Sequence, residues 1–457
     1  MIRLDGLPIV TTEQMRAAEA QAIAAGATVD GLMARAGEAV AEQVRRLAAG
    51  AEVLVVCGPG NNGGDGYVAA AALKRAGHSV RVACFSEPRT AAAGAARARW
   101  TGAIEPLSEA MLAPVLLDAM FGVGLTRELD KGVTGSLRRL IEGARLSIAV
   151  DVPSGVSSDD GASLADLPPV DVTLALGAPK PAHVLQPAAQ RCGAVRVLDI
   201  RVAVEGSVRV AAAPRLTRPV PEAHKYSRGL VAVVGGAMPG AAALTATAAA
   251  RSGAGYVLLL GSATDRLPHA IVRRRFSAEA LGDERVGAVV IGPGLGREDQ
   301  AKGRLDAALA CGRPLVIDGD ALHLLDGRKV DGPMIVTPHA GEFTAMFGEI
   351  GGSKIEQAHE AARRSGAIVV FKGADTVIAA PDGRVVVQPD GPAWLSTAGT
   401  GDVLAGVIGA RLAAGGDPFE AAADGAWLHA EAARLAGPAF MADDLAAHLP
   451  VAIGRCL

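Results

Sequence analysis

The chain has 457 residues, of which 50% are hydrophobic and 20% are charged, a profile typical of a globular protein with a sizeable core. Its length suggests two large domains or about three ordinary ones. Lys and Arg number 45 against 48 Asp and Glu, for a net charge of -3. This balance lacks the basic surface that nucleic-acid binding or polybasic membrane attachment requires.

Cysteine usage and the N-terminus bear on the compartment. The N-terminal residues have no apolar signal-peptide core, and no uninterrupted apolar stretch reaches the roughly 18 residues of a membrane span. We therefore expect a cytoplasmic protein. The cysteines are widely spaced and include no CxxC pair, which argues against a disulfide scaffold or structural zinc and favours a reducing compartment. The five are Cys57, Cys84, Cys192, Cys311 and Cys456.

The first half of the chain alternates helical and strand patterns. Thr11 and Gln14 have the spacing of a helix capping box, and residues 29–49 predict a second helix. A further helix is expected at 67–76. Short apolar strands are expected at 53–57, 79–85, 115–117, 147–150 and 172–176. Strands that alternate with helices predict a parallel sheet with helices on both faces.

A proline-rich stretch, 213–221, predicts a linker between domains at 1–212 and 213–457. Beyond it a second α/β series begins. Its expected strands are 230–234, 256–260, 286–291, 315–317, 334–336, 368–371 and 385–387. The fold expected from the sequence is therefore α/β, with two three-layer α/β/α domains.

A glycine-rich segment, GPGNNGGDG at 58–66, follows the first expected strand and precedes a helix. Such a loop can present backbone N–H groups to a phosphate. The segment also matches GxGxxG, and Glu87 follows the next expected strand, so an NAD-dependent oxidoreductase is one alternative. A glycine-rich turn that binds no ligand is another. The polar groups of Asn61, Asn62 and Asp65 instead suggest oxygen ligands for a cation or a hydroxylated substrate.

Two aspartates, Asp118 and Asp151, directly follow expected parallel strands. Ligands bind at this edge of open α/β sheets. A single aspartate after a strand is a helix cap about as often as it is a ligand-binding residue. Two of them beside the NNGGDG segment instead predict a shared crevice.

Four segments resemble the NAD(P)H-hydrate epimerase domain: LMARAG at 32–37, NNGGDG at 61–66, LDAMFG at 117–122 and VDVPSG at 150–155. The resemblance covers about residues 10–205. It implies a Rossmann-like domain that interconverts R and S forms of hydrated NAD(P)H, with Asp151 near the reacting carbon as acid/base. It implies a potassium site at Asn62, Asp118 and Ser154. It implies substrate contacts at Asn61, Asn62, Gly63, Gly64, Asp65, Gly122, Val123, Gly124, Leu125, Thr126, Arg127, Glu128 and Asp151.

In the second half, the segment TAGTGD at 397–402 places glycines before an amphipathic helix. Backbone N–H groups at such a helix start form an anion hole. Asp402 there can accept a proton from a substrate hydroxyl during phosphoryl transfer, although an N-cap is the alternative. Further polar clusters follow other strands, which is typical of ribokinase-type enzymes; they are GPGLG at 292–296, DGDAL at 318–322, TPHAGE at 337–342 and KGADT at 372–376.

With HKYSRG at 224–229, this ordered set resembles the ADP/ATP-dependent NAD(P)H-hydrate dehydratase over about residues 220–455. The resemblance implies a ribokinase-like fold and catalysis by Asp402. TPHAGE and DGDAL depart from the commoner PHPGE and DADAL but keep the polar groups. The implied nucleotide contacts are Lys372, Gly373, Ala374, Asp375, Thr376 and Gly401. The implied contacts to hydrated substrate are Ala241, Gly294, His339 and Asp402.

Together the two resemblances imply a repair enzyme for hydrated NADH and NADPH (NADHX and NADPHX). ADP or ATP would phosphorylate the C6 hydroxyl before elimination, with Mg²⁺ on the nucleotide and K⁺ in the epimerase domain. We also expect a homo-oligomer. The main alternative is a kinase of a small hydroxylated vitamin or sugar, fused to a non-catalytic nucleotide-binding domain.

Overall fold

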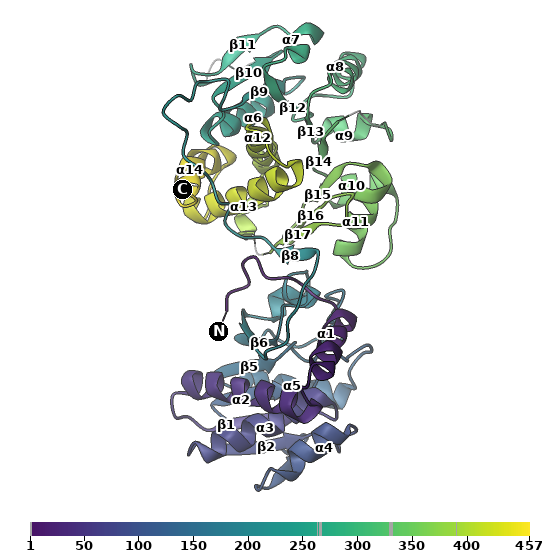
Figure 1. Ribbon diagram of the computed structural model, residues 1–457, viewed down its shortest axis with the longest axis vertical. Helices are drawn as coiled ribbons and strands as arrows, with labels where there is room; N and C mark the ends of the chain where they lie inside the picture. The colour runs from purple at the N-terminus through teal and green to yellow at the C-terminus, as the bar shows by residue number, and fades with distance from the viewer. Residues whose placement is uncertain (1, 263, 265–266, 329–331, 390) are drawn as a thin grey trace. The chain divides into compact units, whose positions relative to one another are not determined.

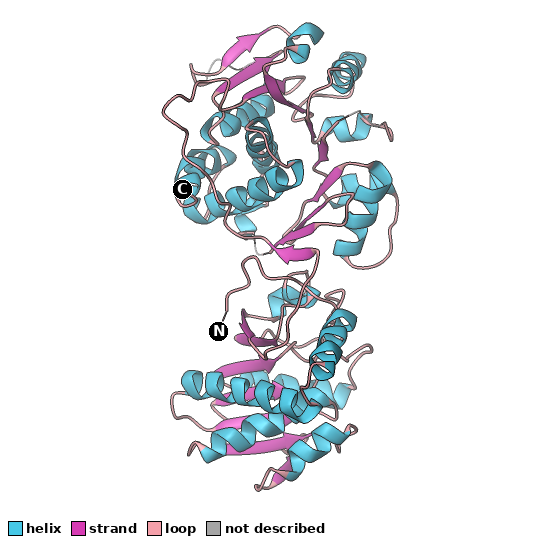
Figure 2. Ribbon diagram, viewed as in Figure 1, coloured by secondary structure: helices cyan, strands magenta, loops and turns pink. Residues whose placement is uncertain are grey.

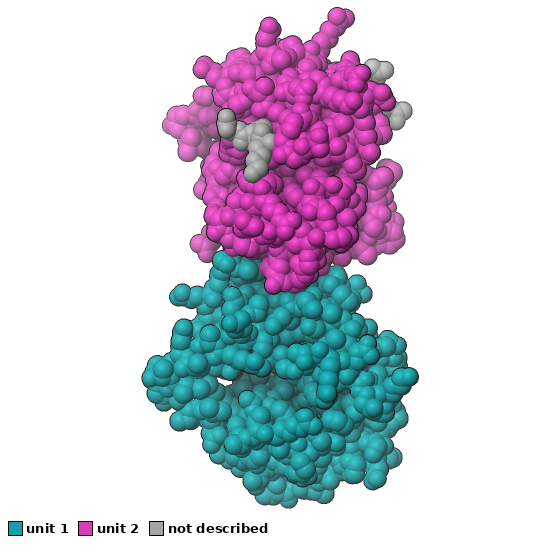
Figure 3. Space-filling view, turned by 90° about the vertical axis from the view of Figure 1, so that its right-hand side faces the viewer, with its two compact units in different colours: residues 1–210 teal, residues 211–457 magenta. Residues whose placement is uncertain are grey.

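The computed structural model describes residues 2–262, 264, 267–328, 332–389 and 391–457. The chain divides into two compact units, residues 1–210 and 211–457 (Figure 3). The sequence predicted this division two residues later, after residue 212. Each unit has a mainly parallel sheet with helices on both faces, so the expected α/β class is confirmed.

The first unit contains a seven-stranded sheet of order β3-β2-β1-β4-β5-β6-β7, in which all neighbours are parallel. This is a Rossmann-like arrangement. Its strands are β1 (Val53–Cys57), β2 (Val80–Cys84), β3 (Ile104–Pro106), β4 (Val115–Ala119), β5 (Leu146–Val150), β6 (Val172–Leu176) and β7 (Ala194–Leu198). The unit ends with β8 (Val208–Val210).

The helices of the first unit cover both faces of this sheet (Figure 1). Val53 and Val55 of β1 pack into one core with α2 and α3, whereas Leu54 and Val56 pack into another with α5. This alternation follows from the two-residue period of a strand. The helices are α1 (Thr12–Ala24), α2 (Val29–Ala48), α3 (Asn61–Arg75), α4 (Ala91–Ala98), α5 (Lys131–Gly143), η1 (Pro181–His183) and η2 (Ala188–Arg191).

The second unit has a sheet whose order runs β11-β10-β9-β12-β13-β14-β15-β16-β17. The strands from β11 to β15 are parallel to their neighbours, and β15, β16 and β17 are antiparallel. The strands are β9 (Leu230–Val234), β10 (Tyr256–Leu260), β11 (Val272–Arg274), β12 (Val286–Ile291), β13 (Leu315–Ile317), β14 (Met334–Val336), β15 (Ile368–Phe371), β16 (Thr376–Ala379) and β17 (Val385–Gln388).

Helices α6, α12 and α13 cover one face of the second sheet, and α8 to α11 lie on the other (Figures 1 and 2). Ala246 of α6 and Ile408 of α12 share one core with Val233 and Val290 of the sheet. The helices are α6 (Pro239–Arg251), α7 (Ala278–Gly282), α8 (Asp299–Ala310), α9 (Asp320–Leu324), α10 (Ala340–Phe347), α11 (Lys354–Ser365), η3 (Ala393–Leu395), α12 (Thr400–Ala413), α13 (Pro418–Ala436) and α14 (Ala442–Gly454).

The structure corrects the expected start of the third helix. The NNGGDG residues are not a loop, because α3 begins at Asn61 rather than at Tyr67. Glycines are poor helix formers, but these allow close packing. A Cβ atom at Gly66 would lie 2.6 Å from the Cβ of Ala119, and one at Gly64 would lie 2.6 Å from Met33. Tertiary packing therefore overrides local propensity.

The proline-rich stretch at 213–221 has no helix or strand, as expected, but it belongs to the second unit. The amide of Leu216 donates to the carbonyl of Cys456 at 3.1 Å, so this segment packs against the C-terminal end of the unit. In the described part of the chain, none of the helices combines the length and apolar character needed to cross a membrane.

Candidate active sites

The loops that follow β1 and β4 meet at the carboxyl edge of the first sheet. A Cβ atom at Gly58 would lie 1.7 Å from the carbonyl oxygen of Met120, and one at Gly63 would lie 1.9 Å from the carbonyl oxygen of Gly58. Any side chain at either position would clash with backbone. These glycines therefore fix the start of α3 against the β4 loop, where the sequence predicts a ligand.

Asp118 and Ser154, two of the three predicted potassium ligands, are in direct contact. The Asp118 carboxylate accepts hydrogen bonds from the hydroxyl of Ser154 at 2.7 Å, from its amide at 2.9 Å and from the Met120 amide at 3.1 Å. Burial raises the pKa of Asp118, although these hydrogen bonds oppose the shift. Within the described residues, no lysine or arginine forms an ion pair with it.

Asn62, the third predicted ligand, lies at the same edge. The position of a Cβ atom at Gly122 is 3.0 Å from its Oδ1, and its Nδ2 is buried without a hydrogen-bond partner. Oxygen and nitrogen of a side-chain amide can be exchanged by a flip. A buried carboxylate without a counter-ion and an unpartnered amide are the groups that a bound cation would satisfy, so the donor set fits K⁺.

Asp151 follows β5 in a left-handed conformation, with a φ of 64°. Its Oδ1 accepts hydrogen bonds from the Leu176 amide at 3.1 Å and from Lys180 Nζ at 2.5 Å. His183 Nε2 lies 2.7 Å from the Asp151 carbonyl oxygen. Burial lowers the pKa of His183 to about 4, so its ring is neutral at pH 7.

The predicted substrate loop at 122–128 lies between β4 and α5. Gly122 and Leu125 are buried and Val123 is half-buried. The Val123 carbonyl accepts a hydrogen bond from Thr12 at the start of α1. The other predicted contacts in this loop are exposed: Gly124, Thr126, Arg127 and Glu128. The loop thus offers both a fixed base beside Asn62 and a free outer segment.

In the second unit, α12 begins at Thr400 and carries Asp402 in its first turn. Gly399 precedes it with a φ of 90°. A Cβ atom at Gly401 would lie 3.5 Å from Lys372 Nζ and 3.8 Å from an Asp318 oxygen. The helix expected after the glycine-rich segment is therefore confirmed, although Gly401 lies inside it, and its first turn lies beside a lysine and a carboxylate.

A charge cluster forms where β13, β14 and β15 end. Lys372 Nζ lies 2.6 Å from Asp318 Oδ1 and 3.8 Å from Glu342 Oε2. The hydroxyl of Thr337 donates to the same Asp318 oxygen at 2.6 Å. Burial opposes the positive charge of Lys372, but Asp318, then Glu342 and Asp402, outweigh it and raise the pKa of the ammonium.

Asp402 is the proton acceptor expected at this cluster. Burial raises its pKa to about 6, with Asp318 and Asp320 adding to the shift and Lys372 opposing it. A carboxylate with a pKa near the working pH suits general base catalysis. Asp402 therefore has the electrostatic environment of an acid/base group.

His339 both caps a helix and faces solvent. Its Nδ1 accepts a hydrogen bond from the Glu342 amide, and the Glu342 carboxylate accepts one from the His339 amide, which forms a capping box at the start of α10. The imidazole remains 62% exposed. The histidine therefore caps the helix, and its Nε2 also lies 3.6 Å from Glu342 Oε1.

Gly294 and Ala241, two predicted substrate contacts, are neighbours. Gly294 has a φ of 61°, and a Cβ atom there would lie 2.9 Å from the Ala241 Cβ and 2.6 Å from the Met238 carbonyl oxygen. The Met238 amide also donates to the Gly294 carbonyl at 2.9 Å. These contacts join the loop after β12 to the start of α6.

The KGADT segment forms a tight turn between β15 and β16. Lys354 Nζ donates to the side chain of Asp375 at 2.7 Å and to its carbonyl at 2.8 Å, while the hydroxyl of Thr376 donates to the Gly373 carbonyl at 3.0 Å. The carboxylate of Asp375 is buried in this pair. Its charge thus holds the turn, and the backbone groups around Ala374 are presented at the surface.

Comparisons with known proteins match both halves of the chain. Residues 29–182 match the family model of the YjeF-related protein N-terminus, and residues 231–454 match the NAD(P)H-hydrate dehydratase model. The bifunctional NAD(P)H-hydrate repair enzyme Nnr of Thermofilum pendens is 34% identical over 89% of this chain and 87% of its own length. This chain belongs to the same family.

Other members of the bifunctional NAD(P)H-hydrate repair enzyme family match over similar lengths. The Nnr protein of Gloeobacter violaceus is 36% identical over 93% of this chain and 92% of its own. A crystal structure of the ADP/ATP-dependent NAD(P)H-hydrate dehydratase of Bacillus subtilis is 31% identical, covers 53% of this chain and 95% of its own, and has a TM-score of 0.48.

Several ionisable residues of this repair-family chain were missed by sequence reasoning. Lys180, His183 and Glu19 gather around Asp151 and Asp65, yet each looked like an ordinary loop or helix residue. The sequence did place Asp318 and Glu342 within strand-end clusters, but it did not indicate their contacts with Lys372. A lysine just after an apolar strand was the only signal for Lys180.

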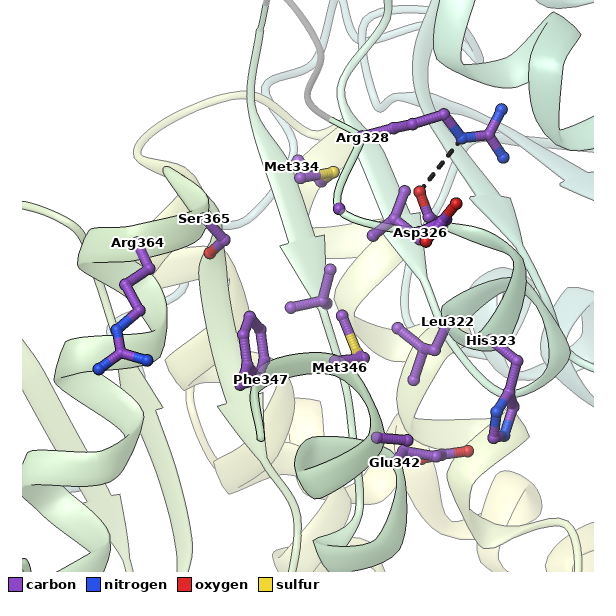
Figure 4. A pocket seen from close by; sticks show the side chains of 14 residues that line it. Leu322, His323, Asp326, Arg328, Met334, Glu342, Met346, Phe347, Arg364 and Ser365 are labelled. Carbon is purple, nitrogen blue, oxygen red and sulfur yellow. Dashed lines mark hydrogen bonds between the residues drawn. The ribbon is translucent and has the colours of Figure 1, made fainter. Parts of the chain in front are cut away.

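A cavity of about 360 Å³ lies beside the charge cluster of the second unit (Figure 4). The side chains of Leu322, Met346 and Phe347 gather around it, and Met334 of β14 lies nearby. Glu342 lines this cavity and also contacts Lys372. None of the site residues predicted from the sequence lines it, so it adjoins the candidate dehydratase site without being that site.

Proposed function

We propose that this chain repairs hydrated NADH and NADPH through two activities. Its first domain, residues 1–212, interconverts the R and S forms, and its second, residues 213–457, dehydrates the S form with ADP or ATP as phosphoryl donor. The observation that carries the dehydratase assignment is Asp402, with a pKa of about 6, in the first turn of α12 beside Lys372.

In the second unit, the hydroxyl on C6 of the hydrated nicotinamide attacks the terminal phosphorus of the nucleotide. Its proton passes to Asp402, while the free N–H groups of α12 stabilise the charge that develops on the phosphoryl oxygens. The C6–O bond of the phosphate ester then breaks and C5 loses a proton, which restores the ring double bond. Ala241, Gly294 and His339 would position the hydrated ring for this attack.

Lys372 and the turn at 373–376, together with Gly401, would hold the nucleotide phosphates. Mg²⁺ would neutralise phosphate charge when bound. In the described ranges, no three His, Cys, Asp or Glu side chains gather as a metal site. We therefore expect the ion to be bound mainly by the nucleotide phosphates and water, as Mg²⁺ often is.

In the first unit, Asp151 would take the proton of the C6 hydroxyl as the ring opens to an aldehyde, and return it when the ring closes on the other face. The segments 61–65 and 122–128 would bind the substrate. Asn62, Asp118 and Ser154 would hold K⁺, which would supply a fixed positive charge at the carboxyl edge of the sheet.

The dehydratase assignment is tested with purified S-form substrate, Mg²⁺ and either nucleotide. We expect the near-ultraviolet absorbance of reduced nicotinamide to return with ADP, ATP or both, and Asp402→Asn to abolish its return. No recovery with either nucleotide would contradict the proposal and favour the kinase alternative. The five free thiols suit a reducing cytoplasm, which we propose as the compartment, and a homo-oligomer remains a prediction.

A further inference from the structure

Lys180 is a buried cation that sequence reasoning did not identify. Only 1% of its side chain is exposed. Its ammonium lies 2.5 Å from Asp151 Oδ1 and donates to the Leu176 carbonyl at 2.7 Å. A charge buried this deeply is retained only with a close partner, and Asp151 supplies it.

The bonds around Asp151 make its two carboxylate oxygens unequal. Oδ1 accepts hydrogen bonds from Lys180 and from the Leu176 amide. In the part of the chain that the structure describes, Oδ2 accepts none. The side chain is 10% exposed, so one oxygen is fixed inside the unit and the other is left for a ligand.

The other charged groups that face this pair are mostly acidic. Asp65 of α3 and Glu19 of α1 both interact electrostatically with Asp151 and Lys180, and Arg16 lies near Glu19. Burial, followed by the charges of Asp151 and Glu19, raises the pKa of Asp65 well above its ordinary value. His183 is neutral, as described above. Burial and these charges thus favour the protonated form of Asp65, whereas the Asp151 carboxylate has the ammonium of Lys180 beside it.

We propose that Lys180 is a positioning residue of the epimerase site, which holds Asp151 as the ionised carboxylate and aims its Oδ2 at the C6 hydroxyl of the substrate. The inference rests on the proposed epimerase activity. Lys180 does not touch substrate itself. It separates the roles of two neighbouring carboxyl groups, so that Asp151 takes a proton and Asp65 gives one.

Ring opening in this proposal moves two protons, one to Asp151 and one from Asp65. Asp151 Oδ2 takes the hydroxyl proton, and the O–H electron pair forms the aldehyde carbonyl as the C6–N1 bond breaks. The C6–N1 pair stays on the ring nitrogen, which takes the proton of Asp65. Ring closure on the opposite face of the aldehyde reverses each transfer, so neither carboxyl group is changed after a full cycle.

The test compares the parent chain with Lys180→Met, Lys180→Arg and Lys74→Met. Lys74 is an exposed lysine of the same unit and serves as the control. R-to-S conversion is followed by chromatography without nucleotide, so that the dehydratase is silent, over a range of pH. Circular dichroism and thermal unfolding establish that each variant is folded.

We expect Lys180→Met to lower kcat at pH 7 by at least about a hundredfold. Its activity should return as the pH rises, with the acidic limb of the profile moved up by at least about one pH unit, because a carboxylate that lacks its ammonium binds a proton more tightly. Lys180→Arg keeps the charge and should keep the limb near its parent position. Lys74→Met should match the parent.

A folded Lys180→Met with the parent's acidic limb would overturn the inference, since a purely structural lysine would lower kcat evenly at every pH. A folded Lys180→Arg that is as inactive as Asp151→Asn at every pH would also overturn it. If the parent chain itself fails to interconvert the two forms, the epimerase proposal fails. An active parent with the variant behaviour just described would overturn only the role of Lys180.

Discussion

Lys372 Nζ lies 2.6 Å from Asp318 Oδ1 and thereby links the ends of β13 and β15. The same ammonium is 3.8 Å from Glu342 at the start of α10, and the first turn of α12 lies beside it. One lysine therefore joins four segments that are far apart in sequence. Because it is largely buried among carboxylates, it remains charged in the resting protein and can receive phosphate oxygens.

Replacing Lys372 tests whether this cation serves the nucleotide. Lys372→Met should lower dehydratase kcat/KM for ADP or ATP by at least about a hundredfold and should leave R-to-S conversion unchanged. Lys302→Met, which removes an exposed lysine of α8, is the matched control. Initial rates at varied nucleotide concentration provide the measurement, and a normal kcat/KM for nucleotide in a folded Lys372→Met would contradict the assignment.

The pKa of Asp402 sets a pH dependence for dehydration. Because burial and Asp318 raise it to about 6, the carboxylate is ionised above that pH and protonated below it. The kcat/KM of the dehydratase should fall about tenfold per pH unit on the acidic side of pH 6. Asp320→Asn removes a negative charge that favours protonation, so the acidic limb should move to lower pH, and a limb that stays in place would exclude Asp402 as the titrating base.

Two glycines of the first unit offer a matched pair of substitutions. A Cβ atom at Gly63 would lie 1.9 Å from the Gly58 carbonyl oxygen, whereas one at Gly60 meets nothing within 4 Å. Gly63→Ala should lower the free energy of unfolding by about 2 kcal/mol or more and reduce epimerisation, while Gly60→Ala should change it by less than about 0.5 kcal/mol. Denaturant unfolding compares them, and equal stabilities would mean that the close approach is unimportant.

The proposed potassium site predicts a cation effect that depends on Asp118. With Na⁺ or a large organic cation in place of K⁺, R-to-S conversion should slow in the parent chain. Asp118→Asn removes the buried charge and should abolish this dependence, whereas dehydration should be unaffected. A parent rate that is the same in all cations would argue against the site, even though the donor set fits K⁺.

Much of this architecture was predictable, because it follows from local patterns. Continuous apolar runs such as 53–57 and 286–291 gave the buried parallel strands at their observed positions, and Thr11 with Gln14 does form a capping box. The short edge strand β3 has the sequence IEP and lacks the continuous apolar run that marked the equally short β13 and β14. The strand β16 was not predicted, because its first residue, Thr376, was assigned to the KGADT loop.

The parts of the sites that escaped prediction depend on contacts between distant segments. Lys180 reaches Asp151 across 29 positions of sequence, and Lys372 reaches Asp318 across 54. No local pattern reports that a given lysine will be buried. The helical start of NNGGDG was missed for a related reason, since helix propensity penalises glycine while the packing of α3 requires it.

In the proposed function, two sites in one chain act in sequence on the same damaged cofactor. The most direct measurement is recovery of reduced nicotinamide absorbance from an R and S mixture with Mg²⁺, K⁺ and ADP or ATP, in the parent, in Asp151→Asn and in Asp402→Asn. We expect full recovery in the parent, rapid recovery of the S fraction alone in Asp151→Asn, and none in Asp402→Asn. Full recovery in Asp151→Asn at the parent rate would show that the first site does not supply the S form.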